Sequence, residues 1–144
     1  MKIAVVDGQG GGIGRLMVEK LRAEFGETVQ IIGLGTNALA TSMMLKAGAN
    51  EGASGENAVK YCSNRVDIIV GSIGIIAANS FAGELSPVMA EAIASSDAVK
   101  VLIPINRSAI EVAGVVDESL PMQVDNLVAS VRKVIQRDGS VSKN

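Results

Sequence analysis

Residues 2–14 read KIAVVDGQGGGIG and decide the fold. The first five form a short apolar and β-branched run, which predicts a buried strand. Asp7 and a cluster of glycines follow at once. From Ile13 the apolar residues recur at helical spacing, which predicts a helix over residues 13–25 that Gly26 ends. The stretch is therefore a strand, a glycine-rich turn and a helix.

The same alternation of strands and helices continues toward the carboxyl end. The pattern predicts further strands at 28–32, 66–70, 99–103 and 111–116, a turn-rich connection at 49–55, and helices at 36–46, at 56–64, from Ser86-Pro87 onward, and at 121–137. Strands that are apolar on both sides indicate a parallel sheet covered on both faces. We therefore expect an α/β protein, a three-layer, doubly wound, mostly parallel Rossmann-like sandwich. Residues 1–138 would form this single domain, and residues 139–144 a disordered tail.

The composition argues against several classes of function. The 144 residues carry 13 Lys+Arg against 15 Asp+Glu, a net charge of −2. An acidic chain argues against general binding of nucleic acid or of an anionic membrane surface. With no His and one Cys, we expect no internal disulfide, no metal site and no His-based acid–base catalysis. No segment resembles a signal peptide or a membrane span, so we expect a cytoplasmic protein.

The glycine-rich turn is the strongest functional signal. Five of the seven residues from 8 to 14 are glycine, namely Gly8, Gly10, Gly11, Gly12 and Gly14. Between a strand and a helix, glycines let a phosphate approach the main chain. The N–H groups of the first helical turn, that of Ile13 among them, and the helix dipole then favour the anion. The alternative is that the glycines only allow the helix to pack closely against the strand.

The spacing of these glycines fits one known type of cofactor loop. GxGxxG fails, and no Lys follows as a P-loop requires, whereas GxxxGxG fits at Gly8, Gly12 and Gly14. This pattern resembles the cofactor loop of the short-chain dehydrogenase/reductase family, which implies NAD or NADP as the cofactor. The likeness does not reach the catalytic motif. Its nearest match, Tyr61 and Arg65, lies too early in the chain, and Arg does not replace the tunable amine of a Lys.

The chain as a whole also resembles a small family of uncharacterised bacterial proteins that open with VVDGQGGGIG. That resemblance implies a Rossmann-like fold and no known activity.

Further candidate binding residues follow the other strands, because ligands of doubly wound sheets lie outside the carboxyl ends of the strands. NAD sites place an acid after the second strand for the ribose hydroxyls, and none follows residues 28–32 here. Thr36 and Asn37 are candidates for hydrogen bonds to a ribose or a 2′-phosphate, or else are ordinary helix caps. Ser72 follows the strand at 66–70 and is a candidate for the same pocket.

Two charged residues complete the candidates. Arg107 follows the strand at 99–103 and would clamp a phosphate or carboxylate, or else pair with Glu111 on the surface. Asp7 would bind a ribose hydroxyl or a Mg²⁺ ion, or else accept N–H groups of the loop and hold the turn.

These residues predict a nucleotide- or dinucleotide-binding protein whose ligand phosphates lie on residues 8–14. An NAD(P)-dependent oxidoreductase is the sharper form of this hypothesis, although no proton donor can be named. The alternatives are a non-catalytic regulatory module for a small anionic metabolite and a structural protein without a ligand. The almost uncharged helix at 36–46 and the segment 73–81 favour a homo-oligomer.

Overall fold

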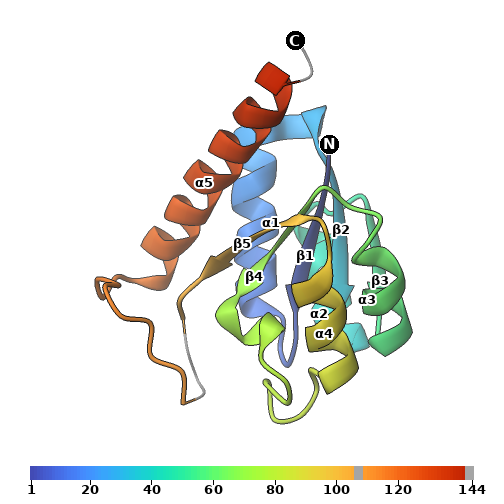
Figure 1. Cartoon of the computed structure of the whole chain (residues 1–144). Helices are drawn as coiled ribbons and strands as arrows, with labels where there is room; N and C mark the ends of the chain where they lie inside the picture. The colour runs from blue at the N-terminus through green and yellow to red at the C-terminus, as the bar shows by residue number, and fades with distance from the viewer. Residues whose placement is uncertain (106–108, 142–144) are drawn as a thin grey trace.

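The protein is an α/β sandwich built on a five-stranded, entirely parallel sheet (Figure 1). A computed structural model describes residues 1–105 and 109–141. The strands lie in the order β3-β2-β1-β4-β5. They are β1 (Lys2–Asp7), β2 (Gln30–Gly35), β3 (Glu51–Ser54), β4 (Ile68–Ser72) and β5 (Val99–Ile103).

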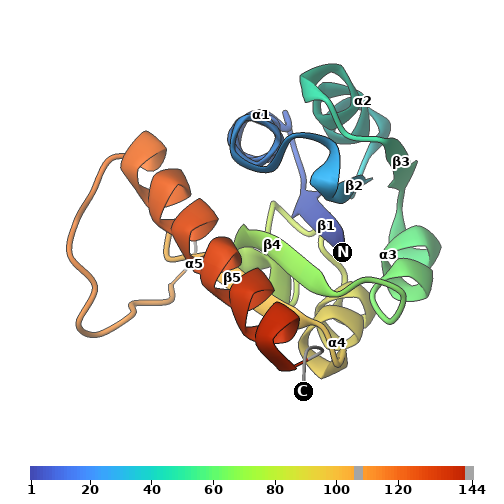
Figure 2. The same ribbon diagram turned by 90° about the horizontal axis from the view of Figure 1, so that it is seen from above.

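Helices cover both faces of the sheet, which makes the three layers visible in Figure 2. The helices are α1 (Gly12–Phe25), α2 (Ala38–Ala47), α3 (Glu56–Cys62), α4 (Pro87–Ser95) and α5 (Leu120–Val141), with short 3₁₀ turns η1 (Gly26–Thr28) and η2 (Ile73–Ile76). The core on one face joins α1, α2 and α5, and the core on the other joins α3 and α4. The predicted doubly wound α/β fold is therefore confirmed.

The central strand β1 explains why the sequence shows no polar alternation. Ile3 and Val5 lie in the core beneath α1 and α5, whereas Ala4 and Val6 lie in the core beneath α3 and α4. Because successive side chains point to opposite faces, a strand covered on both sides is apolar throughout. All four residues are at most 2% exposed.

Glycines in β2 let α2 lie directly on the sheet. A Cβ at Gly33 would lie 2.8 Å from Met44 Cβ, and one at Gly35 would lie 2.6 Å from the carbonyl oxygen of Asn37. β2 runs through these glycines to residue 35, three residues beyond the predicted end, and pairs with β1 as far as Asp7↔Gly35. The start of α2 agrees with the prediction, since Asn37 Oδ1 accepts the N–H of Ala40 at 2.8 Å as its N-cap.

Two predictions about the sheet are wrong. Residues 49–55 were expected to be a turn-rich connection, but they contain β3, which pairs with β2 from Ile32↔Glu51 to Gly35↔Ser54. The ladder hydrogen bonds stabilise a segment whose own β propensity is low. Residues 111–116 were expected to form a strand, but they lie in a loop in which Gly114 has φ +82° and Val116 is 74% exposed. The left-handed glycine interrupts the extended run.

The carboxyl end also differs from the prediction. α5 continues through residues 139–141, which were expected to begin a disordered tail, because the helical ladder extends past Gly139. Residues 142–144 lie outside the described part of the chain. Among the described residues, no helix has the length and apolar character needed to cross a membrane.

Candidate functional site

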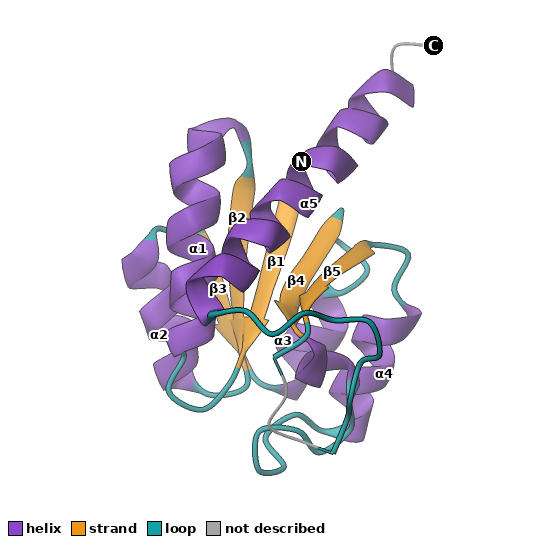
Figure 3. Cartoon of the chain, turned by 90° about the vertical axis from the view of Figure 1, so that its left-hand side faces the viewer, coloured by secondary structure: helices purple, strands orange, loops and turns teal. Residues whose placement is uncertain are grey.

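A cavity of about 580 Å³ lies where the chain connections diverge, at the carboxyl ends of β1 and β4. Figure 3 shows these strands side by side, with the loops gathered at the arrowhead end. Ligands of open α/β sheets bind at such a switch point. The cavity is lined by Asp7, Gly8, Gln9, Gly10, Gly11, Gly12, Ile13, Ser72, Gly74, Ser80, Phe81, Ala82, Ile105 and Leu120. The structure thus brings the predicted glycine turn and Ser72 together around one space.

Asp7 fixes the shape of the glycine turn. Its Oδ1 accepts the N–H of Gly8 at 2.8 Å, and its Oδ2 accepts the N–H of Gly14 at 2.6 Å. The side chain is 5% exposed. Gly14 lies in the first turn of α1, so the carboxylate also stabilises the amino end of that helix. Of the two roles considered for Asp7, the structure shows the second, holding the turn.

Close packing explains three of the five glycines. A Cβ at Gly8 would lie 2.7 Å from Thr36 Oγ1 and 2.8 Å from Phe81 Cδ2. A Cβ at Gly14 would lie 2.8 Å from Asp7 Cβ. Gly11 has φ +77°, and its Cβ would lie 2.8 Å from the Cα of Ala40. At these positions the fold itself requires glycine.

Packing does not explain Gly10 or Gly12. Neither has a φ in the left-handed region, and a Cβ added to either would meet nothing within 4 Å. Both line the cavity. The fold would accept a larger residue at both positions. The effect of having glycine there is that no side chain enters the cavity.

Ser72 contributes a hydroxyl to the cavity at the end of β4. The residue is 5% exposed and lines the cavity. Its hydroxyl caps no helix and has no hydrogen-bond partner among residues 1–105 and 109–141. Because the residue lines the cavity and its hydroxyl is unpaired there, the hydroxyl is available to a ligand.

Thr36 and Asn37 are engaged elsewhere. Glu84 Oε1 accepts hydrogen bonds from Thr36 Oγ1 at 2.6 Å, from Asn37 Nδ2 at 2.8 Å and from the N–H of Gln9 at 2.8 Å. We call these four residues the Glu84 cluster. The bond from Thr36, followed by that from Gln9, lowers the pKa of Glu84 below its usual value. The carboxylate is therefore ionised at neutral pH.

Sequence reasoning missed Glu84. It lies 48 residues beyond Thr36, in the loop between η2 and α4, and no spacing in the sequence links the two. The structure nevertheless places its carboxylate at the end of β2, where the sequence offered no acid.

The loop that carries Glu84 has an unusual backbone. Asn79, Phe81 and Ala82 have φ values of +68°, +58° and +56°, and Gly83 follows at +91°. Each such non-glycine residue costs about 1–3 kcal/mol, and strain of this kind concentrates at functional sites. Residues 80–82 form one wall of the cavity.

Almost the whole chain matches one protein family. The family model described as Domain of unknown function (DUF3842) matches residues 2–136. The chain belongs to the DUF3842 family. The match begins with β1 and ends within α5, so it includes the whole cavity. It confirms the expected membership of an uncharacterised family.

Two other comparisons find no similar protein. Comparison with curated proteins and with solved structures gives no match. Nothing in these comparisons supports the likeness of the glycine turn to the short-chain dehydrogenase/reductase loop.

The structure also locates Tyr61, Arg65 and Cys62, which the sequence had brought into question. Arg107 lies outside the described residues. Tyr61 and Arg65 do not line the cavity; the Arg65 guanidinium stacks on the Tyr61 ring, 3.8 Å from its centroid. Burial raises the pKa of the Cys62 thiol, so it is protonated at neutral pH and a poor nucleophile. In the described part of the chain, no three His, Cys, Asp or Glu residues gather to hold a metal ion.

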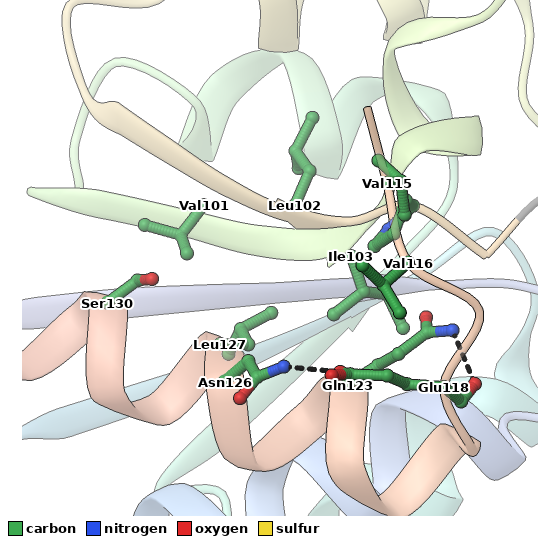
Figure 4. A pocket seen from close by; sticks show the side chains of 11 residues that line it. Val101, Leu102, Ile103, Val115, Val116, Glu118, Gln123, Asn126, Leu127 and Ser130 are labelled. Carbon is green, nitrogen blue, oxygen red and sulfur yellow. Dashed lines mark hydrogen bonds between the residues drawn. The ribbon is translucent and has the colours of Figure 1, made fainter. Parts of the chain in front are cut away.

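A second cavity of the DUF3842 chain, of about 290 Å³, lies between β5 and α5 (Figure 4). Asn126 Nδ2 donates to Glu118 Oε2 at 2.6 Å, and Gln123 Nε2 donates to the Glu118 carbonyl at 2.9 Å. Gln123 Oε1 is buried and accepts no hydrogen bond from the described residues. The other walls are mainly apolar, with Val101, Leu102, Ile103, Val115 and Val116. The cavity beside the glycine turn is larger and exposes more polar surface, so it is the stronger candidate.

Proposed function

We propose that the protein binds a nucleotide or related phosphate-bearing small molecule, with the phosphate on the turn from residue 10 to 13. The observation that carries the proposal is the open space at Gly10 and Gly12. The fold does not need glycine there, whereas a phosphate close to the main chain does.

The amino end of α1 supplies donors for such a phosphate. The first N–H groups of a helix have no partner within it. In α1, Asp7 accepts the N–H of Gly14, while Gly12 and Ile13 line the cavity. Their N–H groups, the helix dipole and the Ser72 hydroxyl together favour an anion. Ile105 and Leu120 also line the cavity and form an apolar part of its wall that is suited to a base or another apolar group.

The cavity favours binding over catalysis. Among residues 1–105 and 109–141, the polar side chains on its wall are those of Asp7, Gln9, Ser72 and Ser80. Asp7 holds the turn, and Ser80 Oγ donates to the Ala77 carbonyl at 2.8 Å. These groups do not form the acid–base pair that hydride transfer requires. A binding or regulatory module is therefore proposed ahead of an NAD(P)-dependent oxidoreductase.

A ligand panel tests this proposal. We expect phosphate compounds to raise the melting temperature of the purified protein in proportion to the logarithm of their concentration, because they bind only the folded state. The panel holds inorganic phosphate, pyrophosphate, AMP, GMP, ATP, NAD, NADH, NADP and NADPH, with chloride and sulfate salts matching the ionic strength. Unchanged melting temperatures with every phosphate compound at millimolar concentration would contradict the proposal.

We further propose that the chain forms a homo-oligomer through α2. Leu39 is 60% exposed and Leu45 is 43% exposed on this helix. The segment 73–81 supports the proposal less than its composition implied, because Ile75 is buried in the chain's own core.

Light scattering coupled to size-exclusion chromatography tests this second proposal. Leu39→Glu is expected to lower the mass of the assembly, because a charge would be buried in the interface. Met122→Glu on α5 is the matched control, since Met122 is also exposed, at 49%, and lies outside α2. An unaltered protein that elutes as a monomer at every concentration would disprove the idea.

A further inference from the structure

The two flanks of the glycine turn differ in how open they are to a ligand. The flank toward β2 is closed by the Glu84 cluster, in which Asn37 Nδ2 also donates to the Gln9 carbonyl at 3.0 Å. A Cβ at Gly8 would lie 2.7 Å from Thr36 Oγ1 of this cluster. The flank toward β4 holds the cavity that Ser72 lines at the end of that strand, and Gly10 and Gly12, which meet nothing within 4 Å, line the same cavity. A ligand therefore has access from the β4 side.

The loop that carries Glu84 is held by hydrogen bonds and by a buried side chain. Within the loop, the N–H of Asn79 donates to the Leu85 carbonyl at 2.7 Å, and the N–H of Leu85 donates to the Ser80 carbonyl at 3.0 Å. Leu85 is fully buried and anchors the loop in the core. Glu84, next to this anchor, then bonds to Thr36 and Asn37 after β2 and to Gln9 in the glycine turn. The loop is therefore held both by the burial of Leu85 and by the hydrogen bonds that Glu84 accepts.

A dinucleotide needs both flanks. In doubly wound sheets it lies across the switch point, with one nucleoside on each side, and the ribose nearer β2 meets the residues that follow that strand. Here the Glu84 cluster occupies that side, since Glu84 accepts hydrogen bonds from Thr36 and Asn37 directly after β2. The ionised Glu84 carboxylate would also repel a 2′-phosphate. A ligand with one nucleoside or sugar has room toward Ile105 and Leu120.

We propose that the site takes a compact phosphate monoester, such as a nucleoside monophosphate or a sugar phosphate, and that the Glu84 cluster excludes NAD and NADP. This inference rests on the proposed function and narrows its ligand class.

Isothermal titration calorimetry with AMP, ribose 5-phosphate, inorganic phosphate, NAD and NADP tests the inference. In the unaltered protein, AMP or ribose 5-phosphate is expected to bind at least about ten-fold more tightly than NAD or NADP, a difference of about 1.4 kcal/mol. Comparing AMP with ribose 5-phosphate shows whether a base contributes. NAD binding as tightly as the monoesters would overturn the inference but leave the proposed function intact. Failure of every phosphate compound to bind would overturn both.

Variants of Glu84 test the cause of the exclusion. Glu84→Ala is expected to improve the affinity for NAD relative to AMP at least about ten-fold, because it frees the flank toward β2. Glu84→Gln keeps an acceptor oxygen and should change the ratio less. Glu27→Ala is the control, since Glu27 is exposed in η1 at the opposite end of β2. An unchanged NAD-to-AMP ratio in Glu84→Ala would overturn the assigned role of the cluster.

Hydrogen exchange supplies a readout independent of any ligand. The N–H of Gln9 is expected to be protected in the unaltered protein and to exchange faster in Glu84→Ala, since Glu84 accepts its hydrogen bond. A Gln9 N–H that exchanges equally fast in both proteins would show that the cluster does not close this flank in solution.

Discussion

Gly12→Val is expected to weaken phosphate binding about 100-fold while leaving the free energy of unfolding within about 1 kcal/mol of its original value. A Cβ at Gly12 meets nothing within 4 Å, so the valine enters the cavity rather than the core. There it holds a phosphate away from the N–H groups of the first turn of α1. Calorimetry with AMP or inorganic phosphate measures the first effect, and urea unfolding measures the second.

Gly14→Ala is the matched comparison, two residues further along the same turn. Its Cβ would lie 2.8 Å from Asp7 Cβ and 2.9 Å from Met44 Sδ. We expect a loss of about 2–4 kcal/mol in stability, because a well-packed site is overfilled and the Asp7 bond to the turn is displaced. If Gly12→Val binds phosphate normally, the ligand does not use this turn, and the proposed function is wrong.

The architecture was predictable from the sequence because its signals are local. The run at residues 2–6, the glycine turn and the helical spacing that follows all lie within one βα unit, and the layered parallel sheet follows from repeating it. β3 was missed because its stability comes from pairing with β2 and not from its own residues. The strand predicted at residues 111–116 is absent because a β-branched composition does not reveal the conformation of Gly114.

The candidate site was predictable only where it is contiguous in sequence. The glycine turn and Ser72 were identified because each directly follows a strand, and the ends of parallel strands meet at one edge of the sheet. Phe81 and Glu84 were missed because they reach the site through a loop whose path depends on left-handed residues and on the burial of Leu85. The sequence did show that no acid directly follows β2, but not that Glu84 of this loop supplies one there.

Asp7→Ala is expected to lower the free energy of unfolding by about 3 kcal/mol, a large part of the 5–15 kcal/mol typical of a domain. The substitution removes the carboxylate that accepts the N–H groups of Gly8 and Gly14. In the absence of that acceptor, two donors in a buried turn lose their partner, and each costs about 1–3 kcal/mol. The melting temperature should fall by about 10 °C.

Two further variants separate this effect from the loss of any carboxylate. Asp7→Asn keeps one acceptor oxygen, so its loss of stability should lie between those of the unaltered protein and Asp7→Ala. Asp67→Ala removes an acid that accepts one exposed bond, from the N–H of Lys2 at 2.7 Å, and should cost less than about 1 kcal/mol. If urea unfolding finds Asp7→Ala as stable as Asp67→Ala, the turn does not depend on Asp7. The role assigned to the carboxylate here would then have to be replaced by direct binding of a ligand.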